Sequence, residues 1–189
     1  DGAEGGARRE VRGRAQRSDR GLAGEESGGG GVGPGLGNAS ASRIRELIGR
    51  VERPMVVDAD GLNIPAGEIE VLKRCRGPRL LTPHPGEMQR LFASGKMARA
   101  GIARSCCEQF PVTLLLKGSR AIVAQRDFPL SFNTTGNPGM ATGGMGDVLT
   151  GVCAGLIGQG LSLYDAARVG AWPTQASPVC PEAYQGRLE

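Results

Sequence analysis

Residues 133–151, which read NTTGNPGMATGGMGDVLTG, place a run of glycines and one carboxylate directly before an apolar helix. The helix is predicted because large apolar residues recur at the spacing of one helical face. These residues are Val148, Leu149, Val152, Cys153, Leu156 and Ile157. The other side carries residues small enough for a second backbone to approach closely, namely Thr150, Gly151, Ala154 and Gly155. The segment therefore predicts a packed helix that follows a flexible turn.

The same glycine run predicts an anion-binding site. The first N–H groups of a helix lack intrahelical partners, and the helix dipole places about half a positive charge there. Gly143, Gly144 and Gly146 supply the backbone freedom to direct these N–H groups at a phosphoryl oxygen. Asp147 then lies where it can accept a proton from a substrate hydroxyl. A plain helix cap is the alternative for Asp147, because aspartate is a favoured capping residue.

Short apolar strands alternate with helices along the rest of the chain. We expect strands at residues 55–57, 80–81, 113–116 and 121–124. We expect helices at residues 44–51, 86–92, 102–110 and 162–171, the last of them stopped by Pro173. Candidate capping residues for the first helix are Asn38, Ser40 and Ser42. The alternation predicts a layered α/β domain.

Composition narrows the class of protein. The 189 residues suffice for one globular domain, and no apolar run reaches the roughly 18 residues of a membrane-spanning helix. Residues 1–31 are rich in glycine and arginine and lack the apolar core of a secretory signal, so we expect them to be disordered and the protein to be cytoplasmic. The chain has a net charge of +4, but aromatic residues are not interleaved with its basic residues. This argues against a nucleic-acid partner.

The number and spacing of the cysteines predict that their side chains are free thiols. The chain has five cysteines without a C-x-x-C pair and one histidine, His84, which argues against a structural zinc site. Cys106 and Cys107 are adjacent and cannot easily bridge each other, and the odd count argues against a disulfide framework. A reducing compartment is therefore expected.

Four segments together resemble a known family. They are VDADGLN at residues 57–63, LTPHPGEM at residues 81–88, LLLKG at residues 114–118 and NPGMATGGMGDVLTG at residues 137–151. The residues of these segments and their order along the chain resemble those of the ADP- or ATP-dependent NAD(P)H-hydrate dehydratases of the ribokinase-like superfamily. The resemblance implies a partial ribokinase-like α/β/α domain with a mostly parallel sheet.

The resemblance also implies an activity. Enzymes of this family dehydrate hydrated NADH or NADPH, using ADP or ATP with Mg²⁺, by phosphorylating the hydrate and then losing phosphate. Asp147 would accept the hydroxyl proton, while N–H groups from Gly144 to Gly146 would stabilise the transferring phosphoryl group. The sequence of the glycine segment resembles the ADP-dependent branch of the family more closely than the ATP-dependent branch. The alternatives are a ribokinase-like small-molecule kinase and a nucleotide-binding fragment without catalysis.

The resemblance assigns two groups of site residues. The substrate-binding group is Gly35, His84, Pro85, Gly86, Glu87 and Asp147. The nucleotide-binding group is Lys117, Gly118, Ser119, Arg120, Asn137, Gly143, Gly144, Met145 and Gly146. A purely structural histidine and a solvated turn lysine are the alternatives for His84 and Lys117. The chain departs from the family at Arg120 and Ala121, where small residues and a threonine are usual.

Asp58 and Asp60 form a separate candidate. Two carboxylates at i and i+2 would point the same way on a straight strand, where they could bind Mg²⁺ through water. They could equally cap and turn the chain into Gly61 and Asn63.

The extent of the resemblance divides the chain into three parts. We expect a disordered segment at residues 1–31, a partial dehydratase domain at residues 32–172 and an irregular tail at residues 173–189. Family members have an α/β segment upstream of the GPGLG motif at residues 33–37, and this chain has only the glycine- and arginine-rich stretch. We hypothesise that the chain keeps the catalytic half of a dehydratase with reduced activity. Assembly into a homo-oligomer is also implied by the resemblance.

Overall fold

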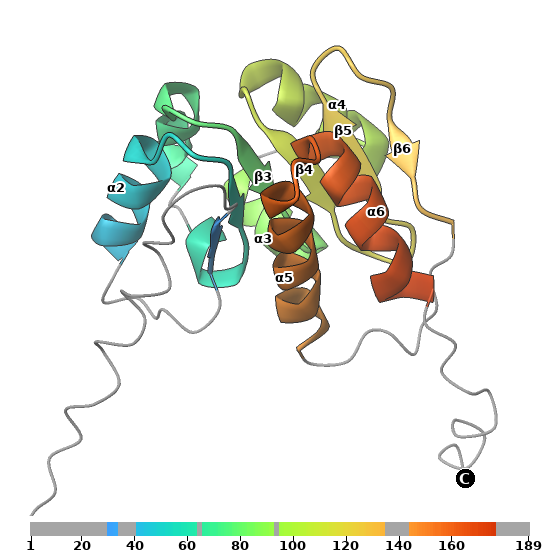
Figure 1. Cartoon of the computed structure of the whole chain (residues 1–189). Helices are drawn as coiled ribbons and strands as arrows, with labels where there is room; N and C mark the ends of the chain where they lie inside the picture. Colours follow the sequence, from blue (N-terminus) through green and yellow to red (C-terminus); the bar gives the residue numbers. More distant parts are fainter. Residues whose placement is uncertain (1–29, 34–40, 64–65, 93–94, 135–143, 177–189) are drawn as a thin grey trace, which may run out of the picture.

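Six strands form one sheet whose order follows the order of the chain (Figure 1). The computed structural model describes residues 30–33, 41–63, 66–92, 95–134 and 144–176. Its strands are β1 Gly30–Val32, β2 Met55–Val57, β3 Arg79–Leu81, β4 Thr113–Leu116, β5 Ile122–Gln125 and β6 Ser131–Phe132. Strands β1 to β4 are parallel, and β5 and β6 are antiparallel to their neighbours. The mostly parallel sheet is confirmed.

Helices cover both faces of the sheet. They are α2 Ala41–Arg50, the 3₁₀ helices η2 Ala59–Leu62 and η3 Ala66–Arg74, α3 Pro85–Leu91, α4 Arg99–Gln109, α5 Met145–Gly158 and α6 Leu163–Ala176. Alternate strand residues face opposite layers. Val57, Leu81 and Leu114 pack in one core with α2, α3 and α4, while Val56 and Leu80 pack with α5 and α6. Figure 1 shows α5 and α6 side by side on their face of the sheet. The layered α/β/α architecture is confirmed.

Most predicted elements lie within two residues of their observed positions. Strands β2 and β4 match residues 55–57 and 113–116, and the helix predicted from Ile44 is α2. Strand β1 begins at Gly30, two residues before the expected start of order. Strand β6 and helix η3 were not predicted, because a two-residue strand and a 3₁₀ helix leave little periodic signal. In the described ranges, no helix is both long enough and apolar enough to span a membrane.

Two predicted helix ends were wrong. Helix α6 continues past Pro173 to Ala176. Because Pro173 lies in the last turn, its missing N–H removes one intrahelical hydrogen bond near the end, where the helix is already short of partners. Ser42 lies inside α2 and does not precede it, because the helix starts at Ala41. The other capping candidates, Asn38 and Ser40, lie outside the described residues.

Arg79 anchors the end of α2 to the start of β3. The side chain is 1% exposed, and its guanidinium donates to the carbonyl oxygens of Ile48 at 2.8 Å, Arg53 at 3.1 Å and Pro78 at 2.9 Å. It also donates to the carbonyl of Val51. The carbonyl of Ile48 lies in the last turn of α2, where carbonyls lack intrahelical partners and a cation is favoured, and the other carbonyls lie in the loops before β2 and β3. Burial lowers the pKa of Arg79, so the anchor is held by hydrogen bonds at a cost in desolvation.

Substituting Arg79→Met should lower the free energy of unfolding by about 3 kcal/mol, because it removes the donor from the buried carbonyl of Ile48 and from three partly buried carbonyls. Urea denaturation followed by circular dichroism measures the change. Arg74→Met, at an exposed position of η3, is the matched control and should leave the midpoint unchanged. Equal midpoints for both variants would show that Arg79 is not an anchor.

Three buried thiols make the free energy of unfolding depend on pH in the alkaline range. Burial raises the pKa of Cys106, Cys107 and Cys153 to about 12, from an ordinary value of 9.0. Below pH 9 these thiols are neutral in both states, and their contribution to stability is fully present. Between pH 9 and 12 the unfolded chain releases protons that the folded chain keeps, so stability falls as pH rises.

We therefore expect the free energy of unfolding to fall by about 1.4 kcal/mol per pH unit for each such thiol in that range. Denaturation midpoints measured at intervals above pH 8 test this. Cys153→Ala should give a shallower slope than the unsubstituted protein, which separates the thiol effect from the titration of lysine and tyrosine. An identical slope would contradict the assignment.

Candidate functional site

The carboxyl ends of β2, β3 and β4 lie at one edge of the sheet, and the start of α5 lies near Asp58 and Lys117 at that edge. Asp58 follows β2, Thr82 and Pro83 follow β3, and Lys117 follows β4. The backbone N–H of Lys117 donates to the carbonyl of Pro83 at 2.8 Å, so the loops after β3 and β4 are joined directly. In open α/β sheets this edge is where ligands bind.

A buried carboxylate links three elements at this edge. Asp58 is 1% exposed, and its Oδ1 lies 2.7 Å from the ammonium nitrogen of Lys117. The hydroxyl of Thr150, from the second turn of α5, donates to Oδ2 at 2.8 Å. A charge removed from water must be paired and hydrogen-bonded, and here both oxygens have a partner. The site is therefore fixed by contacts 59 and 92 residues apart in the chain.

The first turn of α5 lies against this ion pair. Gly144 precedes the helix with φ of 91°, a left-handed conformation that suits glycine. A Cβ atom on Gly146 would lie 3.4 Å from the Lys117 ammonium and 3.5 Å from Oδ2 of Asp58. The positive end of the helix and the Lys117 ammonium are thus neighbours. The Asp58 carboxylate lies beside both of these positive groups. This arrangement attracts a further anion.

Asp147 is the third residue of α5 and is exposed. The alternative that it is the helix cap is wrong, because the helix begins at Met145 and Gly144 holds the capping position. A carboxylate in the first turn is still stabilised by the helix dipole. Its role as a base stays a prediction.

His84 caps α3. Its Nδ1 accepts hydrogen bonds from the N–H groups of Gly86 at 3.0 Å and Glu87 at 3.2 Å, and the Glu87 carboxylate accepts from the N–H of His84 at 2.7 Å. This reciprocal pair is a capping box with histidine in the place of serine or threonine. Pro85 occupies the first helical position, where its missing N–H costs nothing. The histidine therefore has a structural role, and its contact with a substrate stays a prediction.

Asp58 holds the capping position before η2, and its carbonyl accepts from the N–H of Gly61 at 2.9 Å, so the chain turns there as the second alternative expects. The side chain makes no capping hydrogen bond to η2, and both of its oxygens already bind Lys117 and Thr150. Asp60 does not point the same way along a straight strand, because β2 ends at Val57 and the chain turns into η2. Among the residues that the structure describes, no group of three or more His, Cys, Asp or Glu side chains could hold a metal ion.

The remaining predicted residues lie in two places. Gly118, Ser119 and Arg120 form the exposed turn that follows Lys117. Gly35, Asn137 and Gly143 lie outside the described residues. From the GPGLG motif the structure describes Gly33, where a Cβ atom would lie 2.0 Å from the carbonyl oxygen of Asp58. Only glycine permits this close approach between the ends of β1 and β2.

Sequence reasoning missed Thr150 as a site residue, because it stands among the small residues of α5. Of the small residues of α5 at which a close approach was predicted, Thr150 makes one, whereas Gly151 and Gly155 do not. Gly151 and Gly155 meet nothing within 4 Å of a Cβ atom in the described part of the chain, whereas Thr150 lies 3.2 Å from a Cβ atom on Gly31. A hydroxyl at a buried helix position was the available signal, since such groups need a partner.

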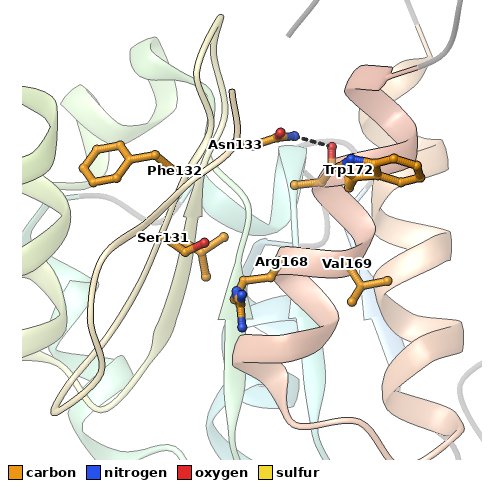
Figure 2. Close-up of a pocket in the computed structure, with 8 residues that line it drawn as sticks. Ser131, Phe132, Asn133, Arg168, Val169 and Trp172 are labelled. Carbon is orange, nitrogen blue, oxygen red and sulfur yellow. Dashed lines mark hydrogen bonds between the residues drawn. The ribbon is translucent and has the colours of Figure 1, made fainter. Parts of the chain in front are cut away.

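A groove of about 390 Å³ lies apart from this site, between β6 and α6 (Figure 2). Its lining is Val123, Ser131, Phe132, Asn133, Arg168, Val169, Ala171 and Trp172. Figure 2 shows the amide of Asn133 bound to the carbonyl of Ala171, at 2.8 Å. None of the predicted site residues lines this groove, so we do not include it in the candidate site.

Asp58→Asn should lower the free energy of unfolding by about 3 kcal/mol, because it leaves the Lys117 ammonium beside an uncharged group. The loss should be smaller in a Lys117→Met background, where no charge is left unpaired. A double-mutant cycle by urea denaturation measures the coupling between the two residues. Additive losses would show that the ion pair does not stabilise the site.

Two curated relatives indicate what the chain is similar to. It is 48% identical over 147 residues to the bifunctional NAD(P)H-hydrate repair enzyme Nnr of Moorella thermoacetica. It is 37% identical over 149 residues to the ADP-dependent (S)-NAD(P)H-hydrate dehydratase of Neisseria meningitidis. Both matches include 75% of this chain, but they include 28% of the Moorella protein and 50% of the Neisseria protein. The chain therefore spans half or less of the length of these relatives.

Solved structures give the same picture. The ADP/ATP-dependent NAD(P)H-hydrate dehydratase of Bacillus subtilis, co-crystallized with ATP/Mg²⁺ and soaked with CoA, superposes with a TM-score of 0.68 at 28% identity. That match covers 87% of this chain and 60% of the other. A ribokinase-like superfamily protein of Enterococcus faecalis gives a TM-score of 0.59 at 25% identity, over 75% of this chain and 50% of the other. A partial ribokinase-like fold is confirmed.

A protein-family model described as NAD(P)H-hydrate dehydratase matches residues 31–183. The matched range contains the four segments that carry the resemblance, together with Asp58, Lys117, Thr150 and the first turn of α5. The fold, the relatives and this match all agree. The chain belongs to the NAD(P)H-hydrate dehydratase family.

Proposed function

We propose that this chain dehydrates hydrated NADH or NADPH at the expense of ADP or ATP, as a repair enzyme of nicotinamide nucleotides. Family membership supports the reaction, and one observation supports the place where it occurs. The ammonium of Lys117 and the first turn of α5 lie together at the carboxyl edge of the sheet, with Asp58 as counter-ion. These groups provide positive charge for a phosphoryl group and leave the nearby Asp147 carboxylate exposed.

The nucleotide fits the Lys117 side of this site. Phosphate oxygens would accept hydrogen bonds from the N–H groups of Gly144, Met145 and Gly146, and would draw the Lys117 ammonium partly away from Asp58. Gly118, Ser119 and Arg120 extend the same loop toward solvent and are proposed contacts of the nucleotide. ADP is the proposed donor because the Neisseria relative is named ADP-dependent. The Bacillus relative is named for both ADP and ATP.

The chemistry divides into two steps. In the first, the hydrate's hydroxyl oxygen attacks the terminal phosphorus of the nucleotide, while Asp147 accepts the hydroxyl proton and the P–O bond to the nucleotide breaks. Backbone N–H groups of the α5 turn stabilise the charge on the phosphoryl oxygens. In the second, the C–O bond to the new phosphate breaks with the loss of a ring proton, and the double bond of the dihydronicotinamide returns.

Mg²⁺ supplies charge neutralisation to the nucleotide phosphates. It needs no protein cage, because Mg²⁺ usually keeps several waters and binds through one or two carboxylates plus substrate phosphates. The described residues fit that mode. Asp147 is an exposed carboxylate in the first turn of α5, whereas both oxygens of Asp58 are already engaged with Lys117 and Thr150.

The substrate is proposed to bind at the PHPGE loop. His84 keeps half of its side chain exposed, while its Nδ1 caps α3 and its Nε2 lies 3.4 Å from Oε1 of Glu87, so a ligand is proposed to contact the exposed part of the ring. Pro85 and the capping box hold the loop rigid, and a rigid loop orients a ligand at a low cost in entropy. Glu87 is largely buried and is proposed to act through the loop geometry.

Free thiols at Cys75, Cys106, Cys107 and Cys153 fit a reducing compartment, and we propose the cytoplasm. The division at residues 31 and 172, assembly into a homo-oligomer and the lack of nucleic-acid or membrane partners stay predictions.

Purified protein with hydrated NADH, ADP and Mg²⁺ should regain NADH absorbance. Asp147→Asn should slow this recovery by about 100-fold or more, as expected for the loss of a general base. Glu108→Gln, at an exposed position of α4, is the matched control and should leave the rate unchanged. Lys117→Met should mainly raise the KM for ADP.

The products separate the proposed reaction from its rivals. A stable phosphate ester without NADH would point to a ribokinase-like kinase. Binding of ADP without any turnover, unchanged by Asp147→Asn, would point to a nucleotide-binding fragment without catalysis. Either result from folded protein would overturn the proposed function.

A further inference from the structure

Arg99 is a cation at an unfavourable position. It is the first residue of α4, where the helix dipole disfavours positive charge. The side chain turns back from the helix toward the end of β4, and there its Nη2 donates to the carbonyls of Leu116 at 3.3 Å and Lys117 at 2.9 Å. The contacts with these two residues account for the position of Arg99.

The guanidinium also covers Gly118. A Cβ atom on Gly118 would lie 2.7 Å from Nη2 and 3.1 Å from Cζ of Arg99, and Gly118 has φ of +144°. The Nε atom of Arg99 is buried and has no hydrogen-bond partner, the one such side-chain atom in the described residues. An unpartnered buried donor is costly. The protein keeps the guanidinium against this backbone despite the cost.

Both backbone groups of Lys117 are therefore fixed. Its N–H is bound to the carbonyl of Pro83 at 2.8 Å, and its carbonyl is bound to Arg99. With the backbone fixed on both sides, the side chain is directed toward Asp58, where the ammonium meets the carboxylate at 2.7 Å. Without Arg99, the glycine at position 118 would leave the end of β4 free to change direction.

We propose that Arg99 is a positioning residue, which holds the end of β4 so that the Lys117 ammonium stays at the start of α5, ready for a phosphate. This assignment of the ligand rests on the proposed function. Lysine is a poorer substitute, because its ammonium can donate to two carbonyls but has no flat guanidinium plane to pack against the backbone of Gly118.

The first test measures the position of Lys117 without any ligand. The chain has three lysines, at positions 73, 96 and 117, so reductive ¹³C-methylation gives a simple NMR spectrum. The Lys117 signal, identified by its loss in Lys117→Arg, should lie apart from that of exposed Lys96. In Arg99→Met it should move toward the Lys96 signal, and in Arg104→Met, an exposed arginine on the same helix, it should not. An unmoved Lys117 signal in Arg99→Met would overturn the proposal.

The second test measures ADP binding by titration calorimetry. Arg99→Met should weaken the affinity by about tenfold, the size of a lost charge-assisted contact at the site. Arg99→Lys, which keeps the charge and is expected to fold, should weaken it by a smaller factor, and Arg104→Met should have no effect. In the turnover assay the loss should appear in the KM for ADP more than in kcat. Unchanged affinity in both Arg99 variants would overturn the proposal.

The two proposals fail in different ways. If the unsubstituted protein binds ADP without dehydrating the substrate, the proposed function fails, while the NMR and calorimetric results still decide the role of Arg99. If the protein is active and the Arg99 variants bind ADP normally with an unmoved Lys117 signal, the positioning role fails and the function stands.

Discussion

The buried carboxylate of Asp58 is the constraint on which the site depends. A charge that is 1% exposed is tolerated only when its oxygens are paired, and the two partners come from β4 and α5. Satisfying one side chain therefore brings together strand ends and a helix start that are distant in sequence. The glycine at position 33 allows β1 to approach the same residue through its backbone. The packing of this edge and the placement of its charges thus have one cause.

Two guanidiniums fasten the surrounding backbone in the same manner. Arg79 binds carbonyls at the end of α2, and Arg99 binds carbonyls at the end of β4. The planar fork of five donors suits arginine to this task, because one side chain reaches several acceptors in fixed directions. The first anchor lies away from the site and contributes to stability. The second lies beside Lys117, so its effect is expected in ligand binding as well.

Local patterns predicted the elements better than the contacts. The helical spacing of apolar residues predicted α2, short apolar runs predicted β2 and β4, and four segments carried the resemblance to the family. The Asp58 pair was not predictable, because its partners lie 59 and 92 residues away and no local rule connects them. The His84 cap was partly visible in the glutamate three residues later, but histidine is an unusual residue for that position. The extension of α6 through Pro173 depended on where the helix ended, which sequence patterns define poorly.

The buried thiols divide between the two helical layers. Cys106 and Cys107 lie in the core under α4, and Cys153 lies in the opposite core between α5, α6 and the sheet. Alkylating reagents attack only the thiolate form of an accessible cysteine. Each helical layer therefore carries its own chemical reporter of local unfolding. Mass spectrometry of alkylated peptides would show which face of the sheet opens first.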